Sequence, residues 1–318
     1  MKRALVLSGG GSKGAFEVGA IANLINKKKL DFQLFTGTSV GALNAAFLGQ
    51  ARNYNELQEL SKELTDLWLG IKGNRCIYRS GLFGNLWRIF RRGALYHPSG
   101  LWDLINRKID PGRLFHPRTV VKVTVVSFET GKILCADSRK PTLRPDYLAY
   151  VMASASMPFF FPAVPIAGQH WYDGGLRDLT PLATAIRENP DEIVVITTFP
   201  LSPNLEATLP PARPGSALKA VLRTVEILLS EISANDLQLA QAINKAWWRY
   251  PGKKPIPIQI IAPAKPLPGH ALSFDPIQIR TNLQAGYEAA EKPHFLAMNL
   301  SPTPSTPPTA AFKRHISE

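Results

Sequence analysis

Residues 8–20 read SGGGSKGAFEVGA and follow a short apolar run, KRALVL, at residues 2–7. An apolar run that ends in glycines and continues with helical periodicity is typical of a strand, a tight turn and a helix. The free N–H groups at the start of such a helix favour an anion. Gly9, Gly11 and Gly14 satisfy the dinucleotide pattern G-x-G-x-x-G, and the same residues begin a phosphate-loop pattern. The glycines therefore predict an anion-binding turn without identifying the anion.

A second glycine turn follows the next strand-like run, in FTGTSVGALNAA at residues 35–46. Gly37, Ser39 and Gly41 form the pattern G-x-S-x-G, the nucleophile elbow of many serine hydrolases. In such an elbow a tight turn holds the serine in a strained backbone conformation with its Oγ exposed. The flanking glycines leave room for the strand, the helix and the substrate. The pattern therefore predicts Ser39 as a nucleophile at the start of a helix that begins near Val40.

The neighbouring residues argue against a nucleotide at the first turn. A phosphate loop needs Lys and then Ser or Thr after its last glycine, whereas Ala15 and Phe16 follow Gly14. The dinucleotide fingerprint needs an acidic residue at the end of the second strand, where this chain has TGTS. N–H donors beside a serine elbow are better explained as an oxyanion hole. A nucleotide-binding or nucleic-acid-binding module is the alternative outside the enzymes, and no recognisable nucleic-acid motif supports it.

A serine nucleophile needs a base within hydrogen-bonding reach. Asp173 stands at a predicted strand end in WYDGGLRDLTP, followed by Gly174 and Gly175, so its carboxylate can approach another backbone closely. A plain Asp-Gly turn without catalytic function is the alternative interpretation of this segment. A Ser-His-Asp α/β-hydrolase using His270 or His294 is the alternative enzyme, although several strands normally precede the elbow in that fold. None of the histidines has a strand-end or glycine-framed context: His97, His116, His170, His270, His294 and His315.

Strand-like and helix-like segments alternate along the chain of 318 residues. This alternation predicts an α/β fold with a mostly parallel central sheet covered by helices on both faces. We expect one domain over residues 1–298 and a proline-rich tail, residues 299–318, with too little apolar content to pack. The expected strands are residues 4–7, 33–35, 120–126, 192–198 and 258–262, and the expected helices are residues 15–27, 42–48, 55–69, 146–155 and 217–248.

The chain is strongly basic, with a formal net charge of +13 and an isoelectric point near 9.8. The excess predicts either an anionic partner or a solubilising surface. Residues 83–102 interleave aromatic residues with arginines, which is typical of a helix at an anionic membrane surface, although a core-facing stripe with a solvated edge has the same pattern. Residues 245–255, KAWWRYPGKKP, form a similar cluster. The residues expected to contact the membrane are Trp87, Arg88, Arg91 and Arg92.

Cys76 and Cys135 lie far apart without a C-x-x-C pattern, so we expect neither a disulfide nor a zinc site and infer a reducing compartment. Glycines interrupt the N-terminal apolar run before a signal-peptide core forms, and no apolar run reaches the ~18 residues of a membrane span. We therefore expect a cytoplasmic protein that acts peripherally at a membrane. No metal, organic cofactor or nucleic-acid partner is expected, and the pattern does not predict the oligomeric state.

Four segments in this order and spacing resemble the patatin-like phospholipases, the family of plant patatins and bacterial lipid acyl hydrolases. They are SGGGSKGAFEVGA, GTSVGALNAA, ASASMPFFFPAV at residues 153–164, and WYDGGLRDLTP at residues 171–181. Many members begin the first segment with aspartate, where this chain has Ser8. Similarity is weak beyond residue 199, although residues 274–292 look like the terminal helix of bacterial members.

The resemblance implies a three-layer α/β/α fold and a phospholipase A-type hydrolase that needs no metal. It implies a histidine-free dyad of Ser39 and Asp173, which would form an acyl-serine and then activate water. It also implies an oxyanion hole built from the N–H groups of Gly9, Gly10 and Gly11, and it assigns to Gly14 the close packing of the following helix. Because both dyad positions are filled, a catalytically inactive lipid-binding relative is disfavoured.

Overall fold

The computed structural model describes most of the chain, namely residues 1–80, 93–202, 204–213, 215–246 and 255–295. Several expectations lie outside these described residues. They are the membrane contacts at Trp87, Arg88, Arg91 and Arg92, most of the second basic cluster, and the tail at residues 299–318.

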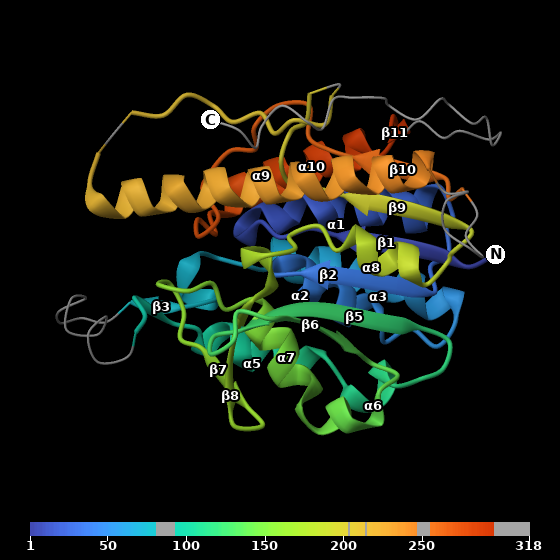
Figure 1. Cartoon of the computed structure of the whole chain (residues 1–318), viewed down its shortest axis with the longest axis horizontal. Helices are drawn as coiled ribbons and strands as arrows, with labels where there is room; N and C mark the ends of the chain where they lie inside the picture. The colour runs from blue at the N-terminus through green and yellow to red at the C-terminus, as the bar shows by residue number, and fades with distance from the viewer. Residues whose placement is uncertain (81–92, 203, 214, 247–254, 296–318) are drawn as a thin grey trace, which may run out of the picture.

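Within the described residues, the centre of the fold is a nine-stranded sheet with the order β11-β10-β9-β1-β2-β5-β8-β7, in which β6 also pairs with β5 (Figure 1). Strands β10, β9, β1, β2 and β5 are parallel to one another, and the remaining pairings are antiparallel. The strands are β1 (Arg3–Leu7), β2 (Leu34–Thr38), β5 (Val120–Ser127), β6 (Ile133–Asp137), β7 (Val164–Ile166), β8 (Gln169–Asp173), β9 (Glu192–Ile196), β10 (Ile258–Ile261) and β11 (His294–Phe295). A separate two-stranded sheet joins β3 (Arg79–Ser80) and β4 (Tyr96–His97).

Helices cover both faces of the sheet because its parallel strands are buried on both sides. Leu5 and Leu7 of β1 pack with α1, α2, α3, α5, α6, α7 and α10, whereas Ala4 and Val6 point to the opposite face and pack with α8 and α9. The three-layer α/β/α architecture is therefore confirmed. The helices are α1 (Gly14–Ala22), α2 (Val40–Leu48), α3 (Tyr54–Leu69), α5 (Ser99–Lys108), α6 (Pro111–Leu114), α7 (Tyr147–Ser154), α8 (Leu182–Arg187), α9 (Ala217–Lys245) and α10 (Pro276–Ala289).

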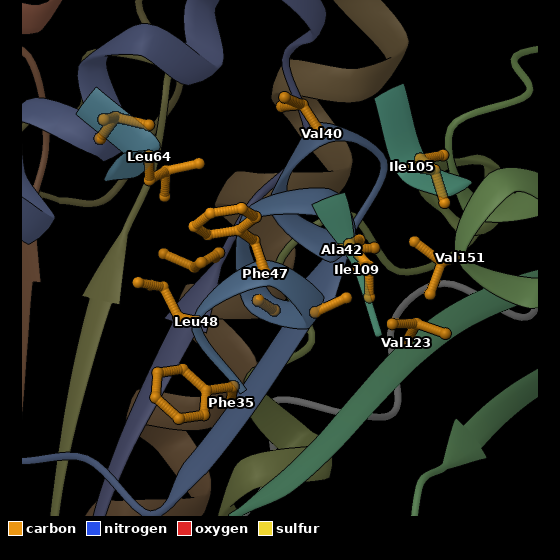
Figure 2. Close-up of a cluster of buried hydrophobic side chains, with 14 of the residues drawn as sticks. Phe35, Val40, Ala42, Phe47, Leu48, Leu64, Ile105, Ile109, Val123 and Val151 are labelled. Carbon is orange, nitrogen blue, oxygen red and sulfur yellow. The ribbon is translucent and has the colours of Figure 1, made fainter. Parts of the chain in front are cut away.

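The larger core lies between the sheet and the helices that follow its strands. Figure 2 shows Phe35 of β2 and Val123 of β5 among side chains of α2, α3, α5 and α7. Phe35 and Val123 are fully buried, and Phe47 of α2 is nearly so. This packing fixes α2, which carries the elbow at its N-terminus, against two central strands.

Helix boundaries differ from the expected ones where local chemistry intervenes. The helix expected over residues 15–27 ends as α1 at Ala22 and continues as one π-helical turn, Asn23–Lys27. Asn23 is fully buried in this turn and donates its side-chain N–H to the carbonyl of Tyr287 in α10 at 2.9 Å. A buried polar partner of this kind stabilises an irregular turn that apolar periodicity does not reveal.

Candidate active site

Ser39 lies between the end of β2 and the first residue of α2. Its backbone has φ 58° and ψ −129°, a conformation that non-glycine residues rarely adopt and that marks strain at functional sites. A side chain at Gly41 would overlap the backbone carbonyls of Leu7 and Ser8, and one at Gly37 would overlap the carbonyl of Gly41. The glycines of G-x-S-x-G are therefore required by close backbone approach.

Strand register brings Asp173 to the same edge of the sheet as Ser39. Thr38 of β2 pairs with Thr124 of β5, and the next β5 residue, Val125, pairs with Asp173 of β8. Strand β6 pairs with both β5 residues and so occupies the other side of β5. Strand β8 must therefore continue the line of β2, which places Asp173 directly beyond the elbow.

The segment at residues 153–164 holds both candidate residues by their backbones. The N–H of Ser39 donates to Oγ of Ser154 at 3.0 Å, and that hydroxyl donates to the carbonyl of Thr124 at 2.7 Å. The N–H of Asp173 donates to the carbonyl of Ser156 at 3.0 Å. Sequence reasoning did not identify Ser154 as part of the site, although it lies in a motif that carried the family resemblance.

Asp173 is completely buried, and its two carboxylate oxygens differ. Oδ1 accepts the N–H of Gly175 at 2.8 Å, whereas Oδ2 has no hydrogen-bond partner within the described part of the chain. Burial raises the pKa of Asp173 to about 7, and the N–H of Gly175 and the nearby hydroxyl of Ser39 lower it to a smaller extent. Gly174 allows this position because a side chain there would overlap the carbonyl of Thr124. The result is a carboxyl group near Ser39 that exchanges its proton near neutral pH.

The first glycine turn is tied down at both ends. The N–H of Ser8 donates to the carbonyl of Ile196 at 3.1 Å, and the N–H of Ser12 donates to the carbonyl of Ala271 at 2.7 Å. The N–H of Gly9, one of the three expected oxyanion donors, already donates to the carbonyl of Leu179 at 3.2 Å. Gly9 therefore does not offer a free donor.

The N–H groups of Gly10 and Gly11 form no hydrogen bond among the described residues, and both glycines line a cavity together with Ser39. These two groups are the donors that remain available to an anion at the elbow. Gly14 lies against Val40 of α2, and a side chain at position 14 would overlap the side chain of Val40.

A buried polar chain that the sequence pattern did not reveal lies beneath the two turns. Asn44 of α2 donates to Oε2 of Glu17 in α1 at 2.9 Å and accepts the indole N–H of Trp68 in α3 at 3.2 Å. Burial raises the pKa of Glu17 well above its ordinary value, although Asn44 and the backbone of Ser8 lower it. Glu17 thus joins three helices behind the site through Asn44. A charged residue inside the apolar run AFEVGA was the signal that could have identified it.

Two cavities meet at Ser39. The first has a volume of about 110 Å³ and lies between α2, α3 and α5, with walls that include Phe47, Leu64 and Ile105. Among the described residues that line it, Lys108 is the only charged one. The second has a volume of about 370 Å³ and extends between the glycine turn and α9. Its walls include the ionisable residues Lys13, Asp173, Arg213, Lys219, Arg223, Glu226 and His270.

The histidines considered for a catalytic triad occupy different places. His294 lies in β11 at the far end of the sheet, separated from β2 by β10, β9 and β1. His270 lines the second cavity, and its Nδ1 accepts the N–H of Leu272 at 3.3 Å. Burial and the charge of Lys13 lower the pKa of His270. Of these two histidines, His270 is thus the one that a triad mechanism would have to use.

The described residues contain no group of three or more His, Cys, Asp or Glu side chains arranged to hold a metal ion. Their helices include none that is both long enough and apolar enough to cross a membrane.

Comparison with known proteins finds similar proteins in bacteria. The chain is 27% identical over 303 residues to the uncharacterized protein YjjU of Escherichia coli (strain K12), covering 89% of this chain and 74% of YjjU. Among solved structures, VipD from Legionella pneumophila has a TM-score of 0.46 and 15% identity, with coverage of 91% of this chain and 66% of VipD.

ExoU in its complex with SpcU from Pseudomonas aeruginosa has a TM-score of 0.31 and 18% identity, with coverage of 76% of this chain and 52% of that one. This chain thus spans between about half and two thirds of the length of these two structures. The model of the patatin-like phospholipase family matches residues 5–186, which include both glycine turns, the segment at residues 153–164 and Asp173. Because this match spans more than half of the sequence, the chain belongs to the patatin-like phospholipase family.

Proposed function

We propose that the protein is a serine lipid acyl hydrolase of the phospholipase A type, in which Ser39 and Asp173 form the catalytic dyad. The observation that carries this proposal is the elbow serine beside a buried carboxyl group whose pKa is raised to about 7, with a cavity on either side. A pKa near the operating pH suits a group that must both take and return a proton. Family membership supports the ester-hydrolysing reaction class.

In the first half of the reaction, Oγ of Ser39 attacks the ester carbonyl carbon and its proton passes to the carboxylate of Asp173. The tetrahedral intermediate then collapses, the bond to the leaving oxygen breaks, and Asp173 returns the proton to the departing alcohol. The products are an acyl-serine and a lysolipid. In the second half, Asp173 takes a proton from water, the hydroxide attacks the acyl-serine, and Ser39 recovers its proton as the fatty acid leaves.

The negative oxygen of each tetrahedral intermediate needs fixed hydrogen-bond donors. We assign this role to the N–H groups of Gly10 and Gly11, because the N–H of Gly9 is engaged with Leu179. The resemblance alone suggested three glycine donors, so this assignment revises it to two. The turn that carries these two donors is anchored on either side by the backbone hydrogen bonds of Ser8 and Ser12. The donors therefore need no reorganisation when the negative charge develops.

The two cavities suggest how an ester would lie across Ser39. The first cavity is narrow and lined almost entirely by apolar side chains, so it suits the acyl chain that becomes bound to the serine. The second cavity is wider and carries charged groups, so it suits the polar part of the lipid. A fatty-acyl ester of a membrane lipid fits this arrangement, and the enzyme would meet that substrate transiently at a membrane surface.

Fatty-acid release from phospholipid vesicles tests the proposal. Wild-type protein should release fatty acid, and Ser39→Ala should lose at least about 1000-fold in turnover because it lacks the nucleophile. Ser202→Ala, which removes the hydroxyl of a partly exposed serine that lines neither cavity, is the control. Equal fatty-acid release by wild type and Ser39→Ala would refute the proposal.

A further inference from the structure

The wall of the second cavity is made largely by a part of the chain beyond the family match, which ends at residue 186. Helix α9 contributes Lys219 and Arg223, and the preceding segment contributes Arg213. Lys13 of the glycine turn faces them from the catalytic half of the molecule. Four cations therefore line one cavity that opens at Ser39.

Only part of this positive charge is neutralised by the protein. Glu226 pairs with Lys13 at 2.8 Å and with Arg223 at 3.0 Å. Burial raises the pKa of Glu226, but these two partners lower it overall, so the carboxylate is ionised at neutral pH. Lys219 and Arg213 form no ion pair within the described part of the chain. One carboxylate thus serves two cations and leaves the cavity with an excess of positive charge.

A quaternary ammonium group binds to free aromatic faces and carboxylates, and on the α9 side of the cavity the groups of these kinds are already engaged. The ammonium of Lys13 already lies over the ring of Phe199, 5.5 Å from its centroid. Glu226 is occupied by its two cations, and Asp173 is buried beside Ser39. A phosphate group with no compensating cation meets complementary charge here, because Lys and Arg both bind phosphate oxygens through charge-assisted hydrogen bonds.

We propose that the second cavity binds the phosphodiester head of an anionic phospholipid, and that Lys219, the cation of α9 that forms no ion pair within the described part of the chain, selects it over a zwitterionic head. This inference rests on the proposed function for the position of the ester at Ser39. It adds the substrate class, and it assigns the selection to α9 rather than to the catalytic turns. The lysolipid that carries the head leaves through the same cavity.

Binding of monomeric short-chain lipids to the Ser39→Ala protein tests the selection without turnover and without a charged membrane surface. Calorimetry should show dihexanoylphosphatidylglycerol binding about tenfold more tightly than dihexanoylphosphatidylcholine, with a preference that falls as ionic strength rises. In the Ser39→Ala background, Lys219→Gln should reduce the preference about fivefold, and Lys219→Glu should abolish it. Lys219 is exposed, so neither change removes a packed side chain.

The matched control is Lys140→Glu, which reverses an exposed cation at the opposite edge of the sheet, beyond the end of β6. It should leave the preference unchanged. Equal binding of the two lipids, binding of neither, or a preference that survives Lys219→Glu would overturn the inference. Inorganic phosphate that binds as tightly as the anionic lipid would also overturn it, in favour of a site for free phosphate.

Hydrolysis assays of the same variants with Ser39 restored distinguish a failure of this inference from a failure of the proposed function. Selective binding without any Ser39-dependent hydrolysis would leave the headgroup site standing and remove the enzyme assignment. Hydrolysis of both lipids with equal kcat/KM, lost in Ser39→Ala, would keep the enzyme assignment and remove the headgroup site.

Discussion

The two sides of the second cavity are built in different ways. On the catalytic side, backbone contacts pack Gly37, Gly41 and Gly174 so closely that none can carry a side chain. On the other side, the first half of α9 is half exposed, and Ile227 and Leu228 have 49% and 57% of their surface accessible. Figure 1 shows these first turns of α9 extending past the edge of the sheet.

The second half of α9 is hydrogen-bonded to Thr180 on the catalytic side of the cavity. Oγ of Ser233 lies 2.7 Å from Oγ1 of Thr180, and Asp236 accepts the N–H of Thr180 at 3.0 Å. Leu237 of the same half is fully buried. The difference between the sides teaches that backbone geometry fixes the proposed chemistry, whereas exchangeable side chains on a less constrained helix would set the choice of lipid.

The largest effect that tests this contrast is expected at Gly41. Gly41→Ala should lower the free energy of unfolding by at least about 3 kcal/mol, because its Cβ would overlap the carbonyls of Leu7 and Ser8. Gly131→Ala is the control: Gly131 has φ 64° but no atom near an added Cβ, so about 1 kcal/mol is expected. Urea unfolding of the two variants measures both values. A similar cost at both positions would show that the elbow is not tightly packed.

The pH dependence of turnover should report the raised pKa of Asp173. The general base must be ionised, so kcat/KM on a soluble ester should be constant above about pH 8 and fall below about pH 7, roughly tenfold for each pH unit. Each tenfold step corresponds to about 1.4 kcal/mol. A profile that stays flat down to pH 5 would mean that Asp173 does not act as the base.

The smallest effect is expected on the outer face of α9. Leu228→Ser should change the free energy of unfolding by less than about 0.5 kcal/mol, because an exposed leucine buries little of its surface on folding. Leu237→Ser, in the buried half of the same helix, should cost at least about 2 kcal/mol. Thermal unfolding of the pair measures the contrast. Equal losses would show that α9 is uniformly packed.

The fold could be predicted from the sequence where strands are continuously apolar. The five expected strands are β1, β2, β5, β9 and β10, the parallel strands buried on both faces. The antiparallel strand β6 was missed because ILCAD has one exposed end, and β7 because VPI is short and interrupted by proline. Strand β8 was anticipated only as the strand end before Asp173. Periodicity thus identified the buried centre of the sheet and not its half-exposed additions.

The candidate site was predictable wherever a residue type is required by the backbone. Ser39 and Asp173 were expected from glycine-framed turns, and the pairing of β5 with both β2 and β8 explains their proximity. Glu17 and Ser154 were missed because their contacts depend on helices brought together by the fold. The engagement of the Gly9 N–H with Leu179 is likewise a long-range contact that local sequence cannot specify.

The central claim is that Ser39 is activated by Asp173 and not by a histidine. Labelling by a fluorophosphonate measures this directly, because the reagent bonds to an activated serine and mass spectrometry locates the adduct. We predict an adduct on Ser39 that is absent in Ser39→Ala and forms at least about 100-fold more slowly in Asp173→Asn, with a far smaller effect of His270→Gln. An adduct on another residue, or labelling slowed as much by His270→Gln as by Asp173→Asn, would contradict the dyad.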